Sequence, residues 1–598
     1  MLKEHPKGLI VAFFANMGER FGFYTMMAIL VLFLQAKYGL SAEKAGSIYS
    51  WFYFAIYALA LVGGMLADYT KKYKTVILFG QIIMFAGYIL LSVPGLSLSV
   101  TIAGLFVIAL GNGLFKGNLQ AVVGQLYDDP KYSKHRDSAF MIFYMGINVG
   151  AFYAPFAATG IRNWWLNVNG FYHDGSLPAL CHQMINGTLK DNSELQTLAN
   201  KASIHGPVTD LAAFAHTYID VFSRGYNYAF GIAAGALVIS LIVYLVFNNL
   251  LPNKEKPAKT TAAKISTGGT LKGLIAVGTA LGLGAVIYFL TNQNIDLAFA
   301  FGLFVGFVIW MLQIATKEER PRVTALLLVF LVVIFFWMSF HQNGLTMTLY
   351  ARDYTFKTVD AITSLFFGFY PIHAVIGAIA GIVLLMGRKN SQNFKLIGAF
   401  LTLAGGGLSY YFYSQAQAQN AISPEIFQSF NPLFIVALTF AVMGFFNWLN
   451  KKGKEPSTPG KIGYGMIIAA IGFTVVLISS LDLISPFQLN GQPVPDTSRV
   501  TPYWLMSSYL ILTIAELCLS PMGLSFVSKV APTRFQGLMQ GGWLLATAVG
   551  NKLLFVGTWA WDKIPLWQLW SIFIVCCLTS AAFMFAMLKR LEKVTKQE

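Results

Sequence analysis

The sequence predicts an all-α membrane protein that crosses the bilayer many times. Of its 598 residues, 56% are hydrophobic and only 11% are charged, whereas about 25% of the residues in a soluble domain are charged. The apolar residues fall in runs that are long enough to cross a bilayer, for which a helix needs about 20 residues. Gly and Phe are abundant, with 55 and 50 residues, as is common in helices packed in lipid.

About sixteen apolar runs are candidate membrane spans. Six of them lie in the first 250 residues, at 9–36, 45–67, 74–94, 98–126, 138–160 and 220–250. Two follow as a closely spaced pair at 271–292 and 294–316. The others lie at 323–346, 361–387, 393–414, 430–450, 462–482, 502–528, 537–560 and 566–590. No cleavable signal peptide is expected, because the first run, which begins near Leu9, is longer than the apolar region of such a peptide.

The distribution of charge indicates an orientation and argues against nucleic acid as a partner. The net charge is +16, but Lys and Arg lie in short clusters between the apolar runs rather than in a basic domain. An even number of spans places both termini on one side, and the cytoplasmic side receives most of the basic clusters, such as 71–74 and 451–454. The polar segment 161–222 then lies outside. Four Cys are too few for a disulfide framework or a zinc site, and no metal or cofactor is expected.

The first apolar run carries an acid and a base next to each other. Asn16, Glu19, Arg20 and Phe23 are spaced so that they lie near one face of a helix. A carboxylate beside a guanidinium is either a proton site with its own counter-ion or a static ion pair that locks two helices. The sequence leaves both interpretations open.

Besides Arg20, the basic residues Lys116 and Lys552 lie within spans. Lys116 and the acid Glu516 stand out, because burying a charge in a span costs at least about 2.5 kcal/mol and usually has a functional reason. Lys116 lies within GNGLFKGN, and a lone lysine in mid-span is seldom purely structural. Glu516 lies within LTIAELCLSPMGL. An unpaired carboxylate at that depth protonates, whereas a cationic group on a substrate would keep it ionised.

Three uncharged or weakly basic residues in the spans allow two interpretations each. His341 in FFWMSFHQNG is either a hydrogen-bonded core residue or a proton carrier, since its reference pKa is near 6.5. Asn148 in FYMGINVGAF is more often an interhelical hydrogen-bonding group than a ligand-binding one. Trp543 in QGGWLLA is either the wall of a pocket or a packing residue.

Several motifs together resemble one family. The segment FMIFYMGINVGAF at 140–152 is similar to the fifth-helix signature of the proton-dependent oligopeptide transporters (POT, also called PTR) of the major facilitator superfamily. GNGLFKGN resembles the lysine motif of their fourth helix, and GERFGFY the second half of the E-x-x-E-R motif of their first. FQSFNPLF, AELCLSPMGLSFVSKVAP and GGWLLATAVGN are similar to their eighth, tenth and eleventh helices.

The resemblance implies the fold of the major facilitator superfamily, with two six-helix bundles related by a pseudo-two-fold axis. Residues 1–250 would form the N-terminal bundle, with a periplasmic insertion at 161–222. Residues 251–322 would form a linker with two extra helices. Residues 323–598 would form the C-terminal bundle, with an inserted hairpin at 361–414. Sixteen spans are expected, or fourteen if one of the two pairs does not cross.

The resemblance also implies roles for individual residues. Lys116 would face the carboxylate of a peptide, and Glu516 would bind its amine together with Asn148 and Asn431. The pocket would be lined by Tyr24, Tyr57 and Trp543, and proton coupling would involve Glu19, Arg20, His341 and Lys116.

Four positions depart from the family pattern. Asn16 replaces the first Glu of E-x-x-E-R, and Phe23 replaces one of a pair of tyrosines. His341 stands where an acid is expected on the seventh helix, and Met27 where some members carry a basic residue. These differences bear on the coupling mechanism and on the substrate.

The function implied by the resemblance is proton-coupled symport of di- and tripeptides into the cell by alternating access. The expected partners are the peptide, protons and the lipid bilayer, and the chain is expected to act as a monomer in the cell inner membrane with both termini in the cytoplasm. In the same fold, the alternative is a proton-coupled carrier of nitrate, an amino-acid conjugate or a peptide-like drug. A peptide sensor that transports nothing stays open. A membrane-embedded enzyme is not expected, because the sequence has no acidic or metal-binding motif at a membrane surface.

Overall fold

The computed structural model describes residues 5–133, 135–252, 267–387, 390–532 and 535–595. Within these ranges, fifteen helices are long and apolar enough to cross a membrane. They correspond to fifteen of the sixteen predicted spans. The remaining one, 537–560, is divided between α20 (Gln536–Lys552) and α21 (Phe555–Trp561).

The first half of the chain forms a bundle of six long helices. They are α1 (Gly8–Tyr38), α2 (Ala42–Thr70), α3 (Tyr73–Ser92), α4 (Leu98–Gln125), α6 (Arg136–Val168) and α9 (Leu211–Val246), and a short α5 (Pro130–Ser133) lies between α4 and α6. Hydroxyl N-caps begin α2 and α4, since Ser41 and Ser97 accept hydrogen bonds from backbone N–H groups in the first turn. Helices α3 and α4 approach closely because both are glycine at the contact: a Cβ atom on Gly111 would lie 2.6 Å from the Gly80 carbonyl oxygen.

The second half forms the other bundle. It begins with α12 (Arg320–Phe340), which continues through η3 (His341–Gly344) into α13 (Thr346–Tyr354). The other helices are α17 (Phe430–Lys451), preceded by η4 (Pro424–Ser429), α18 (Thr458–Ser479), α19 (Pro502–Val530), α20, α21 and α22 (Leu566–Thr595). Short 3-10 segments are η2 (Asn248–Leu250), η5 (Pro486–Gln488) and η6 (Asp496–Ser498). The bundles meet where α2 packs on α20 and α21, and where α6 packs on η4 and α17.

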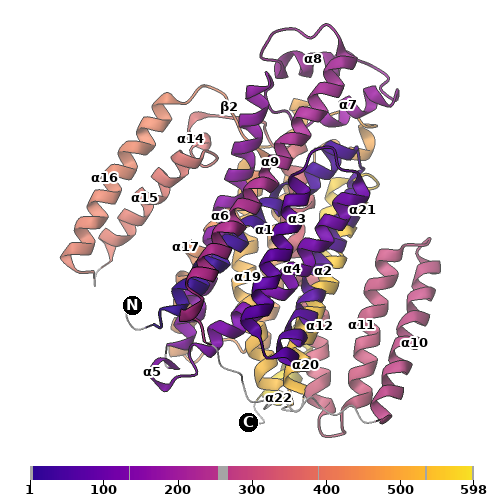
Figure 1. Cartoon of the computed structure of the whole chain (residues 1–598), viewed down its shortest axis with the longest axis vertical. Coiled ribbons are helices and arrows are strands. Elements are labelled where there is room, and N and C mark those ends of the chain that lie inside the picture. Colours follow the sequence, from indigo (N-terminus) through magenta and orange to yellow (C-terminus); the bar gives the residue numbers. More distant parts are fainter. Residues whose placement is uncertain (1–4, 134, 253–266, 388–389, 533–534, 596–598) are drawn as a thin grey trace.

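The two ends of the molecule differ. Both chain termini lie at one end of the helices, which we call the terminal end (Figure 1). Two short helices, α7 (Leu177–Ile185) and α8 (Ser193–Ala202), cover the opposite end, which we call the capped end. The cap is smaller than the segment 161–222 expected from the sequence, because α6 continues to Val168 and α9 already begins at Leu211.

Two helical hairpins flank the bundles on opposite sides (Figure 1). One is α10 (Thr267–Leu290) with α11 (Ile295–Ile314), and the other is α15 (Phe369–Met386) with α16 (Gln392–Gln415). A short antiparallel ladder, β1 (Thr358–Val359) with β2 (Asn420–Ala421), closes the base of the second hairpin, which also contains the short α14 (Ala361–Ser364). Because the chain enters and leaves this hairpin at one point, the helices after it keep their direction.

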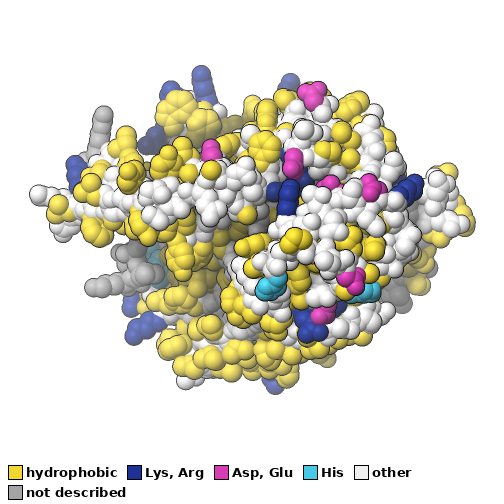
Figure 2. Space-filling view, turned by 90° about the horizontal axis from the view of Figure 1, so that it is seen from above, with side chains coloured by type: hydrophobic (Ala, Val, Ile, Leu, Met, Phe, Trp, Pro, Cys, Tyr) yellow, Lys and Arg dark blue, Asp and Glu magenta, His cyan; other side chains and the backbone are white. Residues whose placement is uncertain are grey.

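The hairpins are apolar but little covered by protein. In their most apolar stretches, 6% of the residues of α10 and 11% of those of α16 are buried, compared with 78% for α1. Seen from the capped end, apolar side chains form much of the rim of the molecule (Figure 2). Lipid tails solvate such surfaces, so this rim identifies the protein as a multi-pass membrane protein.

Candidate functional site

Glu19 and Arg20 form a buried ion pair inside the first bundle. Arg20 donates from Nε and Nη2 to the two oxygens of Glu19, at 2.5 and 2.7 Å, and both side chains are almost fully buried. Asn112 on α4 donates to Glu19 Oε1 at 2.7 Å. The Arg20 guanidinium also lies 4.7 Å from the centre of the Phe23 ring. The pair therefore links α1 to α4, and the adjacent acid and base expected from the sequence are joined.

Lys116 presents its ammonium group to an aromatic ring. Its Nζ atom lies 4.3 Å from the centre of the Tyr57 ring on α2, which is a cation–π contact. Among the described residues, none forms an ion pair with Lys116. Lys116 is half-buried, and a cation that contacts only a ring retains its capacity to bind an anion.

Glu516 and Asn431, which the resemblance assigns to one binding site, contact each other inside the second bundle. Asn431 Nδ2 on α17 donates to Glu516 Oε2 on α19 at 3.0 Å, and to Thr513 Oγ1 at the same distance. Glu516 is only 8% exposed. In the described part of the chain, no Lys, Arg or His forms an ion pair with Glu516.

The two charges lie within electrostatic range of shared groups at the bundle interface. Tyr24 and Tyr57 of the first bundle are close enough to Glu516 for its charge to act on them. Tyr57 also carries the Lys116 ammonium. Tyr57 is therefore shared: it contacts the Lys116 cation on α4 and lies within range of the Glu516 carboxylate on α19.

Asn148 and Trp543, which the resemblance assigns to substrate binding, contact other protein groups in this conformation. Asn148 Nδ2 donates to the Tyr144 carbonyl oxygen of its own helix at 3.0 Å, and no hydrogen bond joins it to Glu516. Trp543 is 5% exposed and packs edge-on against Phe330. Its ring also fills the space beside Gly523, where a Cβ atom would collide with it. Trp543 is here a packing residue rather than the wall of a pocket.

His341 is hydrogen-bonded within the second bundle. Its Nδ1 atom lies 2.5 Å from Asn551 Oδ1 on α20, and its ring stacks on Trp337 at 4.6 Å. His341 and Lys116, which the resemblance assigns together to proton coupling, share no hydrogen bond in this conformation. The reason is that α12 gives way to the 3-10 turn η3 at His341, which leaves Nδ1 facing Asn551. The ring still contacts Tyr53 of α2, at 4.7 Å, and lies within range of the Lys116 charge.

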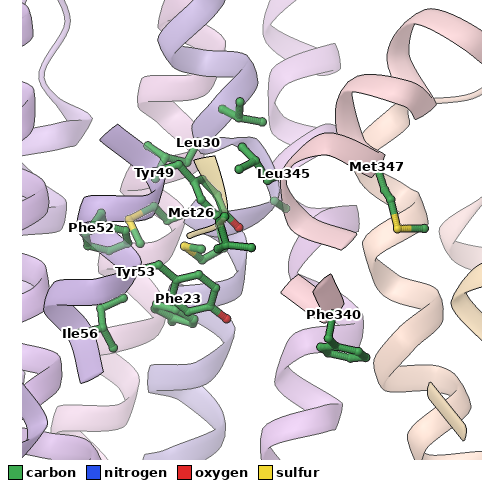
Figure 3. Close-up of a cluster of buried hydrophobic side chains, with 14 of the residues drawn as sticks. Phe23, Met26, Leu30, Tyr49, Phe52, Tyr53, Ile56, Phe340, Leu345 and Met347 are labelled. Atoms are coloured by element: carbon green, nitrogen blue, oxygen red, sulfur yellow. The ribbon is translucent and has the colours of Figure 1, made fainter. Parts of the chain in front are cut away.

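Apolar side chains from both halves of the chain fill the interface beside these groups. Figure 3 shows this cluster, which is contributed by α1, α2 and the α12–α13 region. Its labelled members are Phe23, Met26, Leu30, Tyr49, Phe52, Tyr53, Ile56, Phe340, Leu345 and Met347, all of them buried. Such packing separates the site from the capped end.

Polar contacts also hold the bundles together at the capped end. The guanidinium of Arg162 on α6 is paired with the Glu425 carboxylate on η4, and both side chains are completely buried. Arg162 also donates to Ser423 Oγ at 3.2 Å. Gln428 donates to the Ala28 carbonyl oxygen at 3.3 Å, and Ser429 to that of Phe152 at 3.0 Å. In this structure the capped end is closed.

The cap itself bridges the bundles. Lys357 Nζ contacts Asp174 at 2.8 Å and Ser176 at 3.0 Å, and Gln183 donates to the Gly491 carbonyl oxygen at 2.8 Å. A cavity of about 510 Å³ lies under these contacts, and Gln35 and Arg352 are among its lining residues. None of the predicted site residues lines this cavity.

Sequence analysis missed Arg162 and Glu425. Both lie outside the predicted spans, so their charges were not expected to be buried. A signal was present, because Arg162 lies ten residues after the fifth-helix signature and Glu425 lies two residues before FQSFNPLF.

Two helix bundles with opposite, buried charges facing one interface, closed at one end, define a membrane transporter of the major facilitator type. The sequence model of the POT family matches residues 73–401 and 411–561. The chain belongs to this family, and it is not an enzyme.

Curated relatives match over nearly their whole length. The uncharacterized transporter YclF of Bacillus subtilis is 27% identical, with 94% of this chain and 89% of the relative covered. The peptide transporter YePEPT of Yersinia enterocolitica is 24% identical, covering 92% and 86%. Dipeptide and tripeptide permease A of Escherichia coli is also 24% identical, covering 92% and 83%.

Solved structures share the fold. A crystal structure of a peptide transporter POT in complex with sulfate superposes with a TM-score of 0.63, at 24% identity, covering 99% of this chain and 96% of the other. A POT family transporter in complex with 5-aminolevulinic acid gives a TM-score of 0.63 at 22% identity, covering 99% and 97%.

Proposed function

We propose that this protein is a proton-coupled symporter that imports di- and tripeptides by alternating access. The proposal rests on two charges, Lys116 on the first bundle and Glu516 on the second, on either side of Tyr57. Neither forms an ion pair among the described residues. A zwitterionic peptide has a carboxylate at one end and an ammonium at the other, so it complements this arrangement. The names of the relatives, a peptide transporter and a dipeptide and tripeptide permease, support the same substrate class.

Each charge has a defined task in this proposal. The Lys116 ammonium, already desolvated over Tyr57, binds the carboxylate of the peptide. The Glu516 carboxylate, oriented by Asn431, binds the amine, and Asn148 joins it after turning away from its own helix. With peptide bound, each buried charge has a partner, so the loaded carrier can close around the substrate at lower electrostatic cost.

Proton coupling is assigned to the buried titratable groups near this site. Glu19 is the first candidate, because its proton would release Arg20 from a bidentate pair. His341 is the second, because it stands in the place of an acid and lies within range of Lys116. No cofactor is needed, since the proton gradient supplies the energy.

The location follows from the same proposal. We place the protein in the cell inner membrane, with the terminal end in the cytoplasm and the cap outside, and acting as a monomer. Both termini lie at one end of the molecule (Figure 1), as this orientation requires. Reporter fusions at the two termini, one fluorescent only in the cytoplasm, test it: both should fluoresce.

Uptake into proteoliposomes tests the function. Labelled dipeptides should accumulate when the exterior is made acidic, and a protonophore should abolish accumulation. Sodium-driven uptake that is insensitive to the protonophore would contradict the proposal. Counterflow with a mixed dipeptide library separates a carrier from a sensor, because a sensor exchanges nothing. Competition by nitrate or amino-acid conjugates, without competition by dipeptides, would favour the alternative carrier.

A further inference from the structure

Lys552 is a fully buried lysine for which the proposed peptide site has no use. It ends α20, and its Nζ atom lies 2.7 Å from Asp296 Oδ1 and 3.0 Å from Ser50 Oγ. The same ammonium lies 4.3 Å from the centre of the Trp51 ring. Lys552 therefore contacts α2 of the first bundle as well as its acidic partner.

Asp296 comes from a part of the chain that belongs to neither bundle. It lies in the first turn of α11, in the hairpin between the bundles, and is 8% exposed. Its second oxygen, Oδ2, accepts a hydrogen bond from Ser47 Oγ on α2 at 3.0 Å. The ion pair thus joins three bodies: α2, α20 and the α10–α11 hairpin.

The pair lies at the capped end, where the bundles are in close contact. Gly46, one residue before Ser47, packs against Thr558 of α21 so tightly that a Cβ atom at position 46 would collide with it. Helix α2 begins at the capped end, and α20 and α21 meet it there. Any opening of this end must separate Ser47, Ser50 and Trp51 from the ion pair.

The two charges neutralise each other without α2. Helix α11 packs on α20 as well as on α12, so Asp296 and Lys552 can stay together when α2 leaves. The ion pair then loses two serine hydroxyl bonds and the contact of Lys552 with the Trp51 ring. Helix α11 loses the contacts of its Phe299 ring with Trp51 and Phe54, at 4.8 and 5.1 Å. The pair itself is never divided. Dividing it would leave an uncompensated buried charge, which is far more unfavourable.

We propose that Asp296 and Lys552 form a gate latch, and that the α10–α11 hairpin is a working part of the outer gate. The latch holds α2 through Ser47, Ser50 and Trp51 while the capped end is closed, and releases it when that end opens. This rests on the proposed alternating access, but it concerns the conformational equilibrium and not the identity of the substrate.

Distances between spin labels at the capped end test the latch. Labels are placed at Ser99→Cys on α4 and Asp482→Cys after α18, both exposed, in purified full-length protein whose four native cysteines have been replaced. The ratio of long to short distances gives the ratio of open to closed capped ends. The double variant Ser47→Ala/Ser50→Ala should raise this ratio about ten-fold, which corresponds to about 1.4 kcal/mol.

Charge variants and matched controls define the outcome. Asp296→Asn, which changes only the hairpin, should also raise the open ratio, because the unpaired Lys552 ammonium is fully buried in the closed state, whereas water can reach it once α2 leaves. Ser508→Ala removes a buried serine bond within the second bundle alone, and Asp220→Asn changes an exposed acid on α9. Neither control should move the ratio by more than about two-fold.

The readout does not depend on transport. A protein that carries no peptide, but whose capped end opens in the serine and Asp296 variants, would refute the proposed function and leave the latch standing. An unchanged ratio in the serine variant, or a closed capped end in every variant, would overturn the latch and reduce the pair to a static brace.

Discussion

Asn431 holds the carboxylate of Glu516 at 3.0 Å, so that α17 orients a charged group that α19 carries. This contact fixes one carboxylate oxygen and leaves the charge without a cationic partner among the described residues.

The first prediction concerns that carboxylate. Glu516→Gln should weaken binding of peptides with a free amine by about ten-fold to more than a hundred-fold, because a hydrogen bond to a charged group contributes roughly 1.5–3 kcal/mol. N-acetylated peptides should bind the wild type weakly and lose little more in the variant. Binding is measured by calorimetry or competition. Equal affinity of the wild type for free and acetylated peptides would contradict the assignment.

Lys116 and Tyr57 give a second prediction. Lys116→Met should remove the preference for a free peptide carboxylate over a carboxamide, since the ammonium is its proposed partner. Tyr57→Phe retains a ring under the ammonium, whereas Tyr57→Leu removes a cation–π contact of about 0.5–2 kcal/mol. Uptake should therefore fall further in the Leu variant than in the Phe variant. Identical uptake in the two Tyr57 variants would show that the ring contact is incidental.

The Glu19–Arg20 pair is either a proton site or a static ion pair between helices, and substitutions distinguish the two. Glu19→Gln alone should destabilise the protein by about 3–5 kcal/mol, because it leaves Arg20 buried and unpaired. The double variant Glu19→Gln/Arg20→Gln should recover most of the melting temperature. If Glu19 carries the proton, the double variant folds, exchanges peptide in counterflow and fails in proton-driven uptake. Normal driven uptake by the double variant would identify the pair as a static lock between α1 and α4.

His341 is tested by a substitution that preserves polarity. His341→Gln can still hydrogen-bond Asn551 but cannot take up a proton. If His341 belongs to the coupling path, driven uptake is lost while counterflow persists. Unchanged dependence of driven uptake on pH would show that His341 only packs against Trp337 and bonds Asn551. Asn551→Ala serves as the control, because it removes the hydrogen bond and leaves the imidazole in place.

A last prediction lies outside the membrane, in the loop before α7. Burial, with Arg162 and Lys357 nearby, lowers the pKa of His173 well below 6.5, and its ring stacks on Phe222. Below about pH 6.5, the reference value, the unfolded chain binds a proton that the folded loop does not. Stability should therefore fall as the pH decreases from 7 to 5.5.

Melting temperatures of two variants isolate this contribution. His173→Phe should show a weaker decrease with falling pH than the wild type, whereas His205→Gln, at an exposed position, should behave like the wild type. Parallel pH profiles of His173→Phe and the wild type would show that folding does not lower the pKa of His173.

Much of this molecule was open to prediction because the bilayer imposes strong rules on a sequence. A span needs a long apolar run, so the positions of the helices could be read directly, including both hairpins. A charge in such a run is costly, so the sequence indicated four candidate functional residues: Glu19, Arg20, Lys116 and Glu516. The motifs also indicated the family, which the family model confirms.

The tertiary structure alone decided which charges meet. Asp296 and Lys552 are 256 positions apart in the sequence, and Arg162 and Glu425 belong to different bundles. Apolar periodicity sets how each helix faces lipid or protein, but it carries no information about which polar groups on different helices become neighbours. It also could not show that η3 turns His341 toward Asn551 rather than Lys116. The sequence by itself determined that the chain forms membrane-spanning helices and carries charges within them, because the lipid bilayer requires long apolar runs and makes a charge in such a run costly. The pairing of those charges was decided by how the bundles, the hairpins and the cap pack in three dimensions.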